Sequence, residues 1–370
     1  MDQKGTWNET GRLNTPRFAH TATLLQNGMV LAHGGWWRSY VNGIFTDHGT
    51  LSSAELFNPA TGKWQFVEST FYNRAGHTAT LLRNGKVLIA GGNETTNTEL
   101  FDPAKGAWFA TGRLNTPRLA GHTATALADG RVLVLGGESA PGPANRETSA
   151  EIYDPTTQVW TSTGSLGHVQ YHASATLLLD GRVLVVGGGE TFAELFDPAT
   201  GRWHFTAGPL FGRDGPTTLL QDGTVLMTGG TPRPDEFEVL TVQLFDPTQL
   251  TWRQVGHLSV GRGGHTATLL SSGKVLVAGG LHIDRSSGRR LWLKSAELFD
   301  PTTSRSTLTA PPNTAPAGGT ATRLRPPVPD PAHLDRVLIT GGDDGPQLDN
   351  SLDRAELFLL GRDIVVGLPL

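Results

Sequence analysis

The sequence predicts an all-β fold, a seven-bladed β-propeller built from four-stranded antiparallel blades. A unit resembling residues 74–108 recurs seven times, with a spacing of about 42 to 57 residues. Each unit joins a run of alternating Thr or Ser and apolar residues to an apolar run that ends in Gly-Gly. One four-stranded sheet cannot bury both of its faces, so the units must pack against one another, and a ring lets all seven do so.

The first two strands of the unit are clearest at residues 77–90. Residues 77–82 alternate Thr with apolar residues, which is the period-2 pattern of a half-buried strand. Asn84-Gly85 follows and predicts a type I′ hairpin turn, which needs positive φ at both residues. Residues 87–90 are all apolar, as in a strand buried on both faces, and Gly91-Gly92 ends this run where the backbone must bend or approach a neighbour.

The third and fourth strands follow a loop of variable length. Residues 99–101 predict the third strand, and Asp102-Pro103 predicts a turn into a fourth strand that begins at Trp108. Equivalent tryptophans mark the fourth strand of five units: Trp64, Trp108, Trp160, Trp203 and Trp252. One Thr of the first strand fixes the register of the seven units: Thr23, Thr80, Thr125, Thr176, Thr218, Thr268 and Thr322.

The seventh unit has no clear fourth strand of its own, and the N-terminus supplies a candidate. Residues 7–17 read WNETGRLNTPR, against WFATGRLNTPR at residues 108–118. We therefore expect a strand within residues 5–13 to complete the last blade and close the ring, so that residues 1–370 form a single propeller domain. The C-terminal residues 363–370 could compete for this place or add to the outer edge.

The Gly-Gly pair, the later aromatic residue and the period of roughly 50 residues make the units similar to kelch repeats. They follow the HTATLL…VLVAGG…AELFDP style of bacterial members, and the resemblance covers essentially the whole chain. It implies a seven-bladed propeller of the galactose oxidase-like central domain superfamily. It implies little about activity, because this fold hosts unrelated functions.

Composition narrows the classes of function. A formal net charge of -4 argues against a nucleic-acid binder, whose binding surface would be basic. The chain has no Cys, which removes disulfides and thiolate metal sites and is compatible with a reducing cytoplasm. No apolar run approaches the ~18 residues of a membrane span, and the first residues lack a signal-peptide core. We expect a cytoplasmic monomer that binds neither nucleic acid nor membrane, although a removed signal peptide would leave the same sequence.

The loops predict which face of the ring binds a partner. In a four-stranded blade the 1–2 and 3–4 turns lie on one face, and here they are short and repetitive apart from an insertion at residues 325–335. The 2–3 loops lie on the opposite face. Long, diverse loops on a rigid ring commonly hold binding residues. Five of the 2–3 loops are long: residues 36–53, 138–149, 231–241, 281–295 and 343–354.

A basic residue recurs just before the first strand of most units. Guanidinium groups near the axis could bind a carboxylate, a phosphate or an acidic peptide. Alternatively, each could bond backbone carbonyls or a neighbouring carboxylate as part of the scaffold. The members of this series are Arg17, Arg74, Arg118, His168, Arg213 and Arg262, with Pro316 in the seventh unit.

Two other repeated positions are expected to be structural. One holds His20, His77, His122 and His265. Equivalent residues are spread around the channel, whereas a metal needs its ligands within about 2 Å of one point. The other holds third-strand side chains whose regularity favours hydrogen bonds between blades: Glu55, Glu99, Glu151, Glu194, Gln243, Glu297 and Glu356. We therefore predict neither a metal nor a cofactor.

Residues that depart from the repeat are better candidates for a site, because the scaffold does not require them. Acid–base roles are predicted for Tyr171, His172, Asp214 and His282 on the rim of the loop face. The alternative is that the long loops pack their aromatic residues into small satellite cores. Ligand binding is predicted for Trp36, Trp37, Arg38, Tyr40, His48, Tyr72, Trp292 and Asp343, together with Arg17, Arg74, Arg118, Arg213 and Arg262.

Enzymes among the kelch propellers test the resemblance further. Galactose oxidase-like enzymes use copper and a Cys–Tyr crosslink, which a chain without Cys cannot form. Nitrile-specifier proteins use an ExxxDxxxH iron motif, and none of the twelve His here has an Asp four residues before it. Sialic acid mutarotases are also kelch propellers and need no metal, but we match no specific motif of theirs.

Two functions from different classes follow. The first is a propeller that binds a small anionic or aromatic molecule, or a protein segment, on the face with the long 2–3 loops. The alternative is a cofactor-independent enzyme of the isomerase, mutarotase, cyclase or lyase type, with acid–base residues at the central funnel. The sequence leaves open whether the chain is an enzyme.

Overall fold

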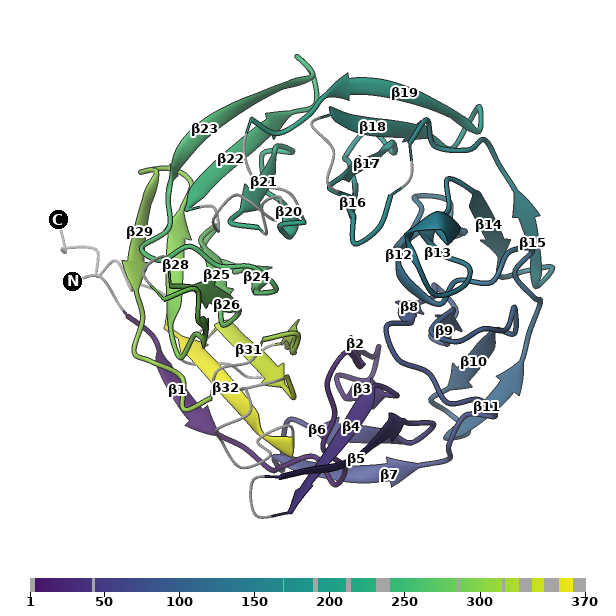
Figure 1. Ribbon diagram of the computed structural model, residues 1–370, viewed down its shortest axis with the longest axis horizontal. Helices are drawn as coiled ribbons and strands as arrows, with labels where there is room; N and C mark the ends of the chain where they lie inside the picture. The colour runs from purple at the N-terminus through teal and green to yellow at the C-terminus, as the bar shows by residue number, and fades with distance from the viewer. Residues whose placement is uncertain are drawn as a thin grey trace, which may run out of the picture.

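The computed structural model describes residues 4–41, 44–168, 170–188, 192–210, 214–230, 240–284, 287–314, 317–325, 335–342 and 353–361, with the backbone alone for 39–41 and 44–46. Seven four-stranded antiparallel sheets form a ring around one axis (Figure 1). The predicted all-β, seven-bladed fold is confirmed. The described part contains one 3-10 turn (Pro143–Asn145) and no α-helix, and none of its helical segments is long and apolar enough to cross a membrane.

The strands of each blade run from the channel outwards. Blade 1 consists of β2 (Thr21–Leu24), β3 (Val30–His33), β6 (Ala54–Asn58) and β7 (Lys63–Val67). Blade 2 consists of β8 (Thr78–Leu81), β9 (Val87–Ala90), β10 (Glu99–Asp102) and β11 (Ala107–Ala110). Blade 3 consists of β12 (Ala120–Ala126), β13 (Val132–Glu138), β14 (Ala150–Asp154) and β15 (Val159–Ser162). Blade 4 consists of β16 (Ser174–Leu177), β17 (Val183–Val186), β18 (Phe192–Asp197) and β19 (Arg202–Ala207). Blade 5 consists of β20 (Thr217–Leu219), β21 (Val225–Thr228), β22 (Thr241–Asp246) and β23 (Thr251–His257). Blade 6 consists of β24 (Thr266–Leu269), β25 (Val275–Ala278), β28 (Ala296–Asp300) and β29 (Arg305–Leu308).

Blade 7 is closed by the N-terminus, as predicted. It consists of β30 (Thr320–Arg323), β31 (Asp335–Thr340), β32 (Ala355–Leu360) and, outermost, β1 (Thr6–Glu9). Strand β1 is shorter than the expected 5–13 and pairs antiparallel with β32, with Trp7 opposite Phe358. Figure 1 shows β1 beside β32, so strands from opposite ends of the sequence lie together in this blade. The alternative segment, residues 363–370, lies outside the described residues.

The hairpin turns between first and second strands differ from the prediction. Gly85 has a φ of 83°, but Asn84 is not among the residues with positive φ, so the turn is not type I′. Gly85 N–H donates to Leu82 O, and Leu82 N–H donates to Lys86 O. This pattern is a type I turn followed by a glycine bulge, in which only the Gly needs the left-handed conformation.

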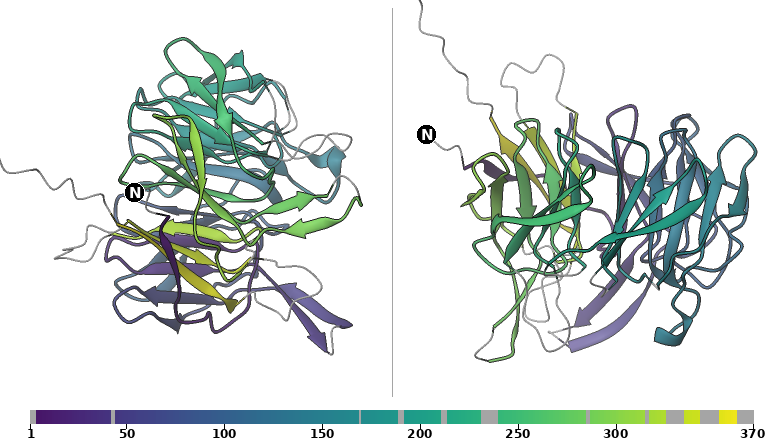
Figure 2. Two further views of the ribbon diagram at one scale, coloured as in Figure 1. Left: turned by 90° about the vertical axis from the view of Figure 1, so that its left-hand side faces the viewer. Right: turned by 90° about the horizontal axis from the view of Figure 1, so that it is seen from above.

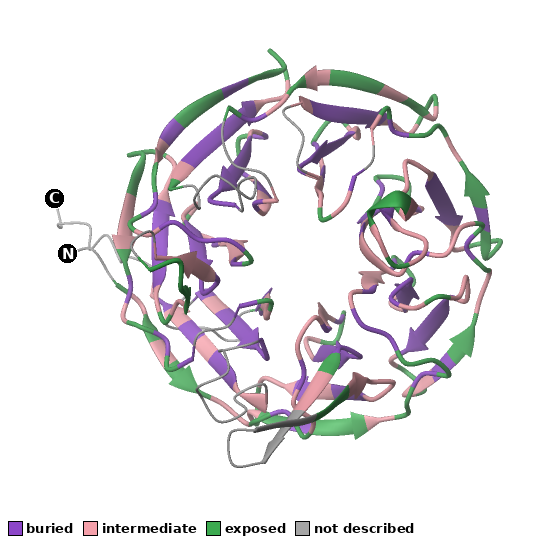
Figure 3. Cartoon of the chain, in the orientation of Figure 1, coloured by how far each residue is buried: buried purple, intermediate pink, exposed green. Residues whose placement is uncertain are grey.

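The core lies between the blades. Seven buried apolar clusters each join two neighbouring blades around the whole ring. At six of the seven junctions a fourth-strand Trp also donates its indole N–H towards the preceding blade, as Trp64 does to Gly11 O at 2.8 Å and Trp252 to Ala207 O at 2.8 Å; β29 of blade 6 has no Trp. Buried residues are concentrated on the middle strands, and the outermost strands are largely exposed (Figure 3).

Three long 2–3 loops fall within the described residues. They contain the hairpin β4 (Trp36–Val41) and β5 (Ile44–Thr50), the 3-10 turn of blade 3, and the hairpin β26 (Leu281–Ile283) and β27 (Arg290–Trp292). All three project from the same side of the ring (Figure 2). We call this side the loop face and the opposite side the turn face. The loops predicted at residues 231–241 and 343–354 lie mostly outside the described residues.

Candidate functional site

The repeated arginines are part of the scaffold. Arg17, Arg74, Arg118 and Arg262 are all fully buried. Arg262 is typical: it donates from Nη1 to Gly279 O at 2.8 Å and from Nη2 to Glu297 Oε1 at 2.8 Å. The other three make the same pair of contacts, each to the first Gly of its Gly-Gly pair and to its third-strand Glu. The ligand-binding role expected for these four therefore gives way to the scaffold alternative.

Blade 4 breaks this pattern, and its register corrects the prediction for His168. In blade 3, the second Gly of the Gly-Gly pair, Gly137, donates its N–H to Gln170 O, as Gly35 donates to Arg74 O in blade 1. Gln170, not His168, thus stands where the other blades have Arg. Gln170 is fully buried, and neither polar atom of its amide has a hydrogen-bond partner in the described structure. Within the described structure, Oε1 of the blade 4 carboxylate, Glu194, also has no hydrogen-bond partner, and burial raises the pKa of Glu194.

The backbone near the start of each innermost strand takes a left-handed turn at one fixed position of the repeat. Its φ lies between 50° and 71° in all seven blades. Left-handed φ favours glycine, and four blades have glycine there. Blade 1 has alanine, whereas blades 4 and 5 have His172 (φ 59°) and Asp214 (φ 60°). The residues of this series are Ala19, Gly76, Gly121, His172, Asp214, Gly264 and Gly318.

In blades 6 and 7 this position has room for a side chain at the mouth of the channel. A Cβ placed on Gly264 or Gly318 would meet no atom within 4 Å. His172 is correspondingly exposed, and its N–H donates to Gly121 O at 2.9 Å, which ties it to blade 3. Asp214 is half-buried and its Oδ1 accepts the N–H of Gly188 at 2.9 Å. Two polar side chains of adjacent blades are therefore presented on the loop face.

Tyr171 and two residues of blade 3 complete the group. The rings of Tyr171 and His172 lie 4.2 Å apart. The guanidinium of Arg146 lies over the ring of Tyr171, with Cζ 4.6 Å from the ring centroid. A Cβ on Gly121 would overlap the Tyr171 ring, so glycine is required for this approach. We call Glu138, Arg146, Tyr171, His172 and Asp214 the rim cluster.

The rim cluster perturbs its own titrating groups. Partial burial raises the pKa of Tyr171, and the hydrogen bond to Glu138 and its charge add to this effect, while Arg146 opposes it. The surrounding protein lowers the pKa of His172 by desolvation, and the carboxylates of Asp214 and Glu138 oppose that change. The His172 imidazole is consequently neutral near pH 7, and the Tyr171 hydroxyl is protonated. A neutral imidazole can accept a proton, and the hydroxyl can donate one.

The predicted binding residues of blade 1 lie on the β4–β5 hairpin, away from the rim cluster in sequence and blade. Trp36 and His48 have ring centroids 6.1 Å apart, and Arg38 lies 4.4 Å over the Phe18 ring. Trp37 packs on the cross-strand Gly49, where a Cβ would lie 2.8 Å from its indole nitrogen. These contacts lie within the hairpin and at its base, and Trp36 remains exposed. The side chain of Tyr40 lies outside the described structure.

The remaining predicted residues are dispersed. His282 lies on β26 of blade 6, where Nδ1 donates to Gly261 O at 3.1 Å. Trp292 pairs with Leu281 at the base of the same hairpin. Tyr72 is exposed in front of blade 2, and Arg74 lies 5.6 Å from its ring centroid. Arg213 and Asp343 lie outside the described residues.

Sequence reasoning missed Glu138, Arg146 and Gln170. The first two lie in a loop that was expected to bind, but that loop has no counterpart in other blades against which a departure could be seen. Gln170 was hidden by a register error, because His168 is basic and sits only two residues earlier. Counting back six residues from the blade's anchor Thr, as for Arg17, Arg74 and Arg262, would have found it.

Comparisons with known proteins agree with this fold. Residues 120–167, which include blade 3, match the family model of the kelch motif. A fungal alcohol oxidase of the AA5 family, determined in complex with copper, has a TM-score of 0.75 at 18% identity, over 97% of this chain and 76% of the oxidase. YjhT has a TM-score of 0.56 at 14% identity, over 80% of this chain and 99% of YjhT. At these identities the likeness shows the fold alone. No curated protein matches the chain by sequence.

The copper of that oxidase raises the question of a metal here. The described residues include no group of three or more His, Asp or Glu side chains that could hold a metal, and the chain has no Cys. The buried His of the repeat are also committed elsewhere, as His265 Nε2 is to Thr228 Oγ1 at 3.0 Å. The described donor set does not fit a copper centre.

Proposed function

We propose that this kelch-type propeller binds a small molecule with an anionic group on its loop face, over the rim cluster of blades 3 to 5. The observation that supports this most is the left-handed backbone at His172 and Asp214. A non-glycine residue in this conformation costs about 1–2 kcal/mol, and strain of this kind collects at functional sites. The fold itself tolerates glycine here, because blades 2, 3, 6 and 7 have it.

The charges of the rim cluster support an anionic, hydrogen-bonding ligand. Arg146 is exposed, and its guanidinium donates no hydrogen bond to the described part of the chain. Its five N–H groups can therefore hold a carboxylate or phosphate. The carboxylates of Glu138 and Asp214 would accept hydrogen bonds from hydroxyl groups, and the Tyr171 ring offers a flat apolar surface. A carboxylated sugar or a similar polar acid combines these features.

Replacing His172 by glycine tests ligand binding without destabilising the fold, because other blades have glycine at this position. We expect His172→Gly to weaken ligand binding by at least about tenfold, while the free energy of unfolding stays unchanged or rises by up to about 1 kcal/mol as strain is relieved. Thermal shift against carboxylated sugars, phosphates and aromatic carboxylates would find the ligand, and calorimetric titration would give its Kd.

Ala19→Gly is the matched control, because it makes the same change at the same backbone position in blade 1. It should leave ligand affinity unaltered. Asp214→Asn, which keeps a side chain able to accept the Gly188 N–H, should weaken binding without lowering stability. Wild-type affinity in both His172→Gly and Asp214→Asn would contradict the proposed site, as would the absence of any response across the panel.

A cofactor-independent proton transfer is the second candidate, supported by the neutral imidazole of His172 beside the protonated hydroxyl of Tyr171. Such a pair suits an isomerase, mutarotase, cyclase or lyase reaction in which a proton leaves one atom and returns to another. If the bound ligand is a substrate, NMR in D2O should show deuterium entering it, and His172→Gly should abolish this exchange. Exchange that persists in His172→Gly would remove His172 from that role.

A further inference from the structure

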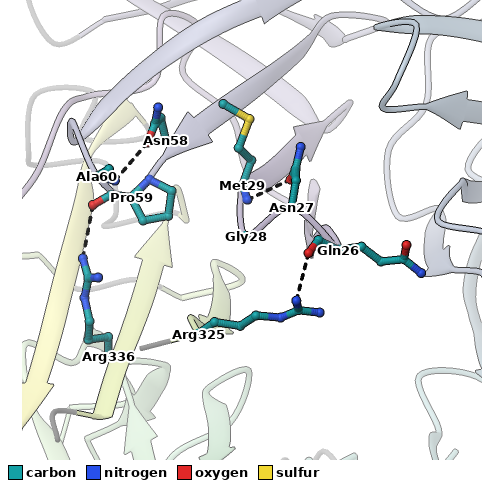
Figure 4. Close-up of a pocket in the computed structure, with 9 residues that line it drawn as sticks. All are labelled: Gln26, Asn27, Gly28, Met29, Asn58, Pro59, Ala60, Arg325 and Arg336. Atoms are coloured by element: carbon teal, nitrogen blue, oxygen red, sulfur yellow. Dashed lines mark hydrogen bonds between the residues drawn. The ribbon is translucent and has the colours of Figure 1, made fainter. Parts of the chain in front are cut away.

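A cavity lies on the turn face, far from the loop face, between blades 7 and 1. It has a volume of about 570 Å³ and is formed by the two turns of blade 1, residues 26–29 and 58–60, together with Arg325 and Arg336 of blade 7 (Figure 4). This volume falls within the range of small-molecule sites.

Both arginines have most of their donors available. Arg325 Nη1 donates to Gln26 O at 2.8 Å, and Arg336 Nη2 donates to Pro59 O at 3.3 Å. Neither forms an ion pair within the described structure, and each guanidinium has five N–H groups. The acid next to Arg336 is engaged elsewhere, because Asp335 is buried, accepts the N–H of Ser271 and pairs with Arg323 at 3.1 Å. Residues 326–334 lie outside the described residues.

The corresponding groove between blades 3 and 4 shows what the repeat alone builds. Its volume is about 250 Å³, less than half as large. Arg131 contacts Pro198 O at 3.4 Å, just as Arg336 contacts Pro59 O, so this contact belongs to the scaffold. There, however, Arg131 pairs with Asp129 at 2.7 Å and Arg182 pairs with Asp180 at 2.6 Å. The positive charges of that groove are neutralised, whereas no described acid pairs with Arg325 or Arg336 in the groove between blades 7 and 1.

Blade 1 lacks the acids that several other blades have at these turns. Asn58 stands where blades 2 to 6 have Asp, and Asn27 stands where blades 3 to 5 have Asp. Each Asn still caps its turn, since Asn27 Oδ1 accepts Met29 N–H at 3.0 Å and Asn58 Oδ1 accepts Ala60 N–H at 2.9 Å (Figure 4). With the oxygen so engaged, each amide nitrogen is left to donate. Asn in place of Asp thus preserves the hydrogen bond of each turn and replaces two negative charges with two hydrogen-bond donors.

We propose that this groove is an oxyanion-binding site, which takes the phosphate or carboxylate group of a small ligand between Arg325 and Arg336. Among the described residues that line it, two guanidinium groups without an ion pair, two amide donors and no acid match a multiply charged oxyanion in charge and in hydrogen bonding. The site is independent of the rim cluster, so it can exist whether or not the loop face binds its ligand.

The test is calorimetric titration of the full chain at low ionic strength, with inorganic phosphate and with succinate as separate probes. The key variant is Asn27→Asp/Asn58→Asp, which restores the acids that other blades carry at these turns and should therefore fold. We expect it to weaken anion binding by at least about tenfold. Arg325→Gln/Arg336→Gln should have the same effect, and the matched pair Arg131→Gln/Arg182→Gln in the blade 3–4 groove should have none.

The two probes distinguish the source of the oxyanion. Binding of phosphate alone would identify a phosphorylated ligand, and binding of succinate alone would identify a carboxylated one; loss of either in Asn27→Asp/Asn58→Asp supports the site. Failure of the wild type to bind either anion would overturn the proposal. So would equal affinity in the wild type and Asn27→Asp/Asn58→Asp.

Discussion

Replacing Arg262 by glutamine is expected to lower the free energy of unfolding by about 3–5 kcal/mol, the usual cost of removing one partner from a buried ion pair. The Arg262 side chain is fully buried and bonds Gly279, Ser295 and Glu297. Without it, the Glu297 carboxylate would remain buried with only its hydrogen bonds to Ser259 N–H and Ser306 Oγ. The shift of the urea midpoint measures the effect, and Arg202→Gln, at an exposed position of β19, should change it little.

Blade 4 already contains the result of such a substitution, so the reverse change can be made there. Gln170→Arg should give Glu194 Oε1 a partner, raise the free energy of unfolding by about 1–3 kcal/mol and lower the pKa of Glu194. A midpoint that falls in Gln170→Arg would contradict the view that blade 4 lacks only its arginine. If Arg262→Gln were as mild as Arg202→Gln, the buried pairs would not be holding the blades.

The fold was predictable because the same pattern of strands and turns occurs seven times in the sequence. The anchor Thr, the Gly-Gly pair and the third-strand motif each fix one strand, and the likeness between residues 7–17 and 108–118 placed β1 in the last blade. What failed was conformational detail within a correct element. Asn84-Gly85 is compatible with both a type I′ turn and a type I turn with a glycine bulge, and the choice depends on how the flanking strands twist and pair.

The repeated arginines show why a repeat alone cannot locate a site. A basic residue that recurs near the axis is equally compatible with a ring of ligand-binding charges and with a set of internal ion pairs. Burial decides between these readings, and burial follows from the reach of each side chain towards its own Gly carbonyl and Glu. His172 and Asp214 were found as departures from the repeat, and Glu138 and Arg146 were not, because their loop is unique to blade 3.

The groove on the turn face could have been found from the same comparison of repeats. Asn58 departs from the Asp of five blades, but an Asp-to-Asn exchange in a turn preserves the turn's hydrogen bond and so attracts no notice. Its meaning depends on Arg325 and Arg336, which come from the far end of the chain and reach this turn only because the ring closes.

The free energy of unfolding is expected to fall steeply as the pH drops from about 6.5 towards 4. The inner ring of the propeller contains buried histidines whose pKa values are held down by burial and then by the neighbouring arginines. The pKa is about 3 for His20, about 4 for His122 and about 3 for His265. His33 and His77 are lowered well below the usual value as well, and they bond each other at 2.9 Å.

The sign follows from which state binds the proton. Below pH about 6.5 these histidines take up protons in the unfolded chain, whereas in the fold they stay neutral until the pH reaches their lowered values. Each therefore removes about 1.4 kcal/mol per pH unit, or roughly 3 kcal/mol by pH 4.5. Three such residues amount to much of the 5–15 kcal/mol by which domains are usually stable. Glu194, whose pKa is raised, acts in the opposite direction and offsets a small part of this loss.

Single substitutions assign this pH dependence to the inner ring. Urea midpoints between pH 7 and 4.5 should fall less steeply in His265→Gln than in the wild type, by about the contribution of one proton. His204→Gln changes an exposed histidine of β19 and should leave the slope as it is. For aspartates with lowered pKa values, such as Asp129 and Asp180, the contribution to the free energy of unfolding is lost only as the pH falls below about 3.8. They therefore do not account for a slope above pH 4.5. A midpoint that stays constant from pH 7 to 4.5 would mean that these histidines are charged inside the fold or reached by water, which would contradict their assignment as buried neutral groups.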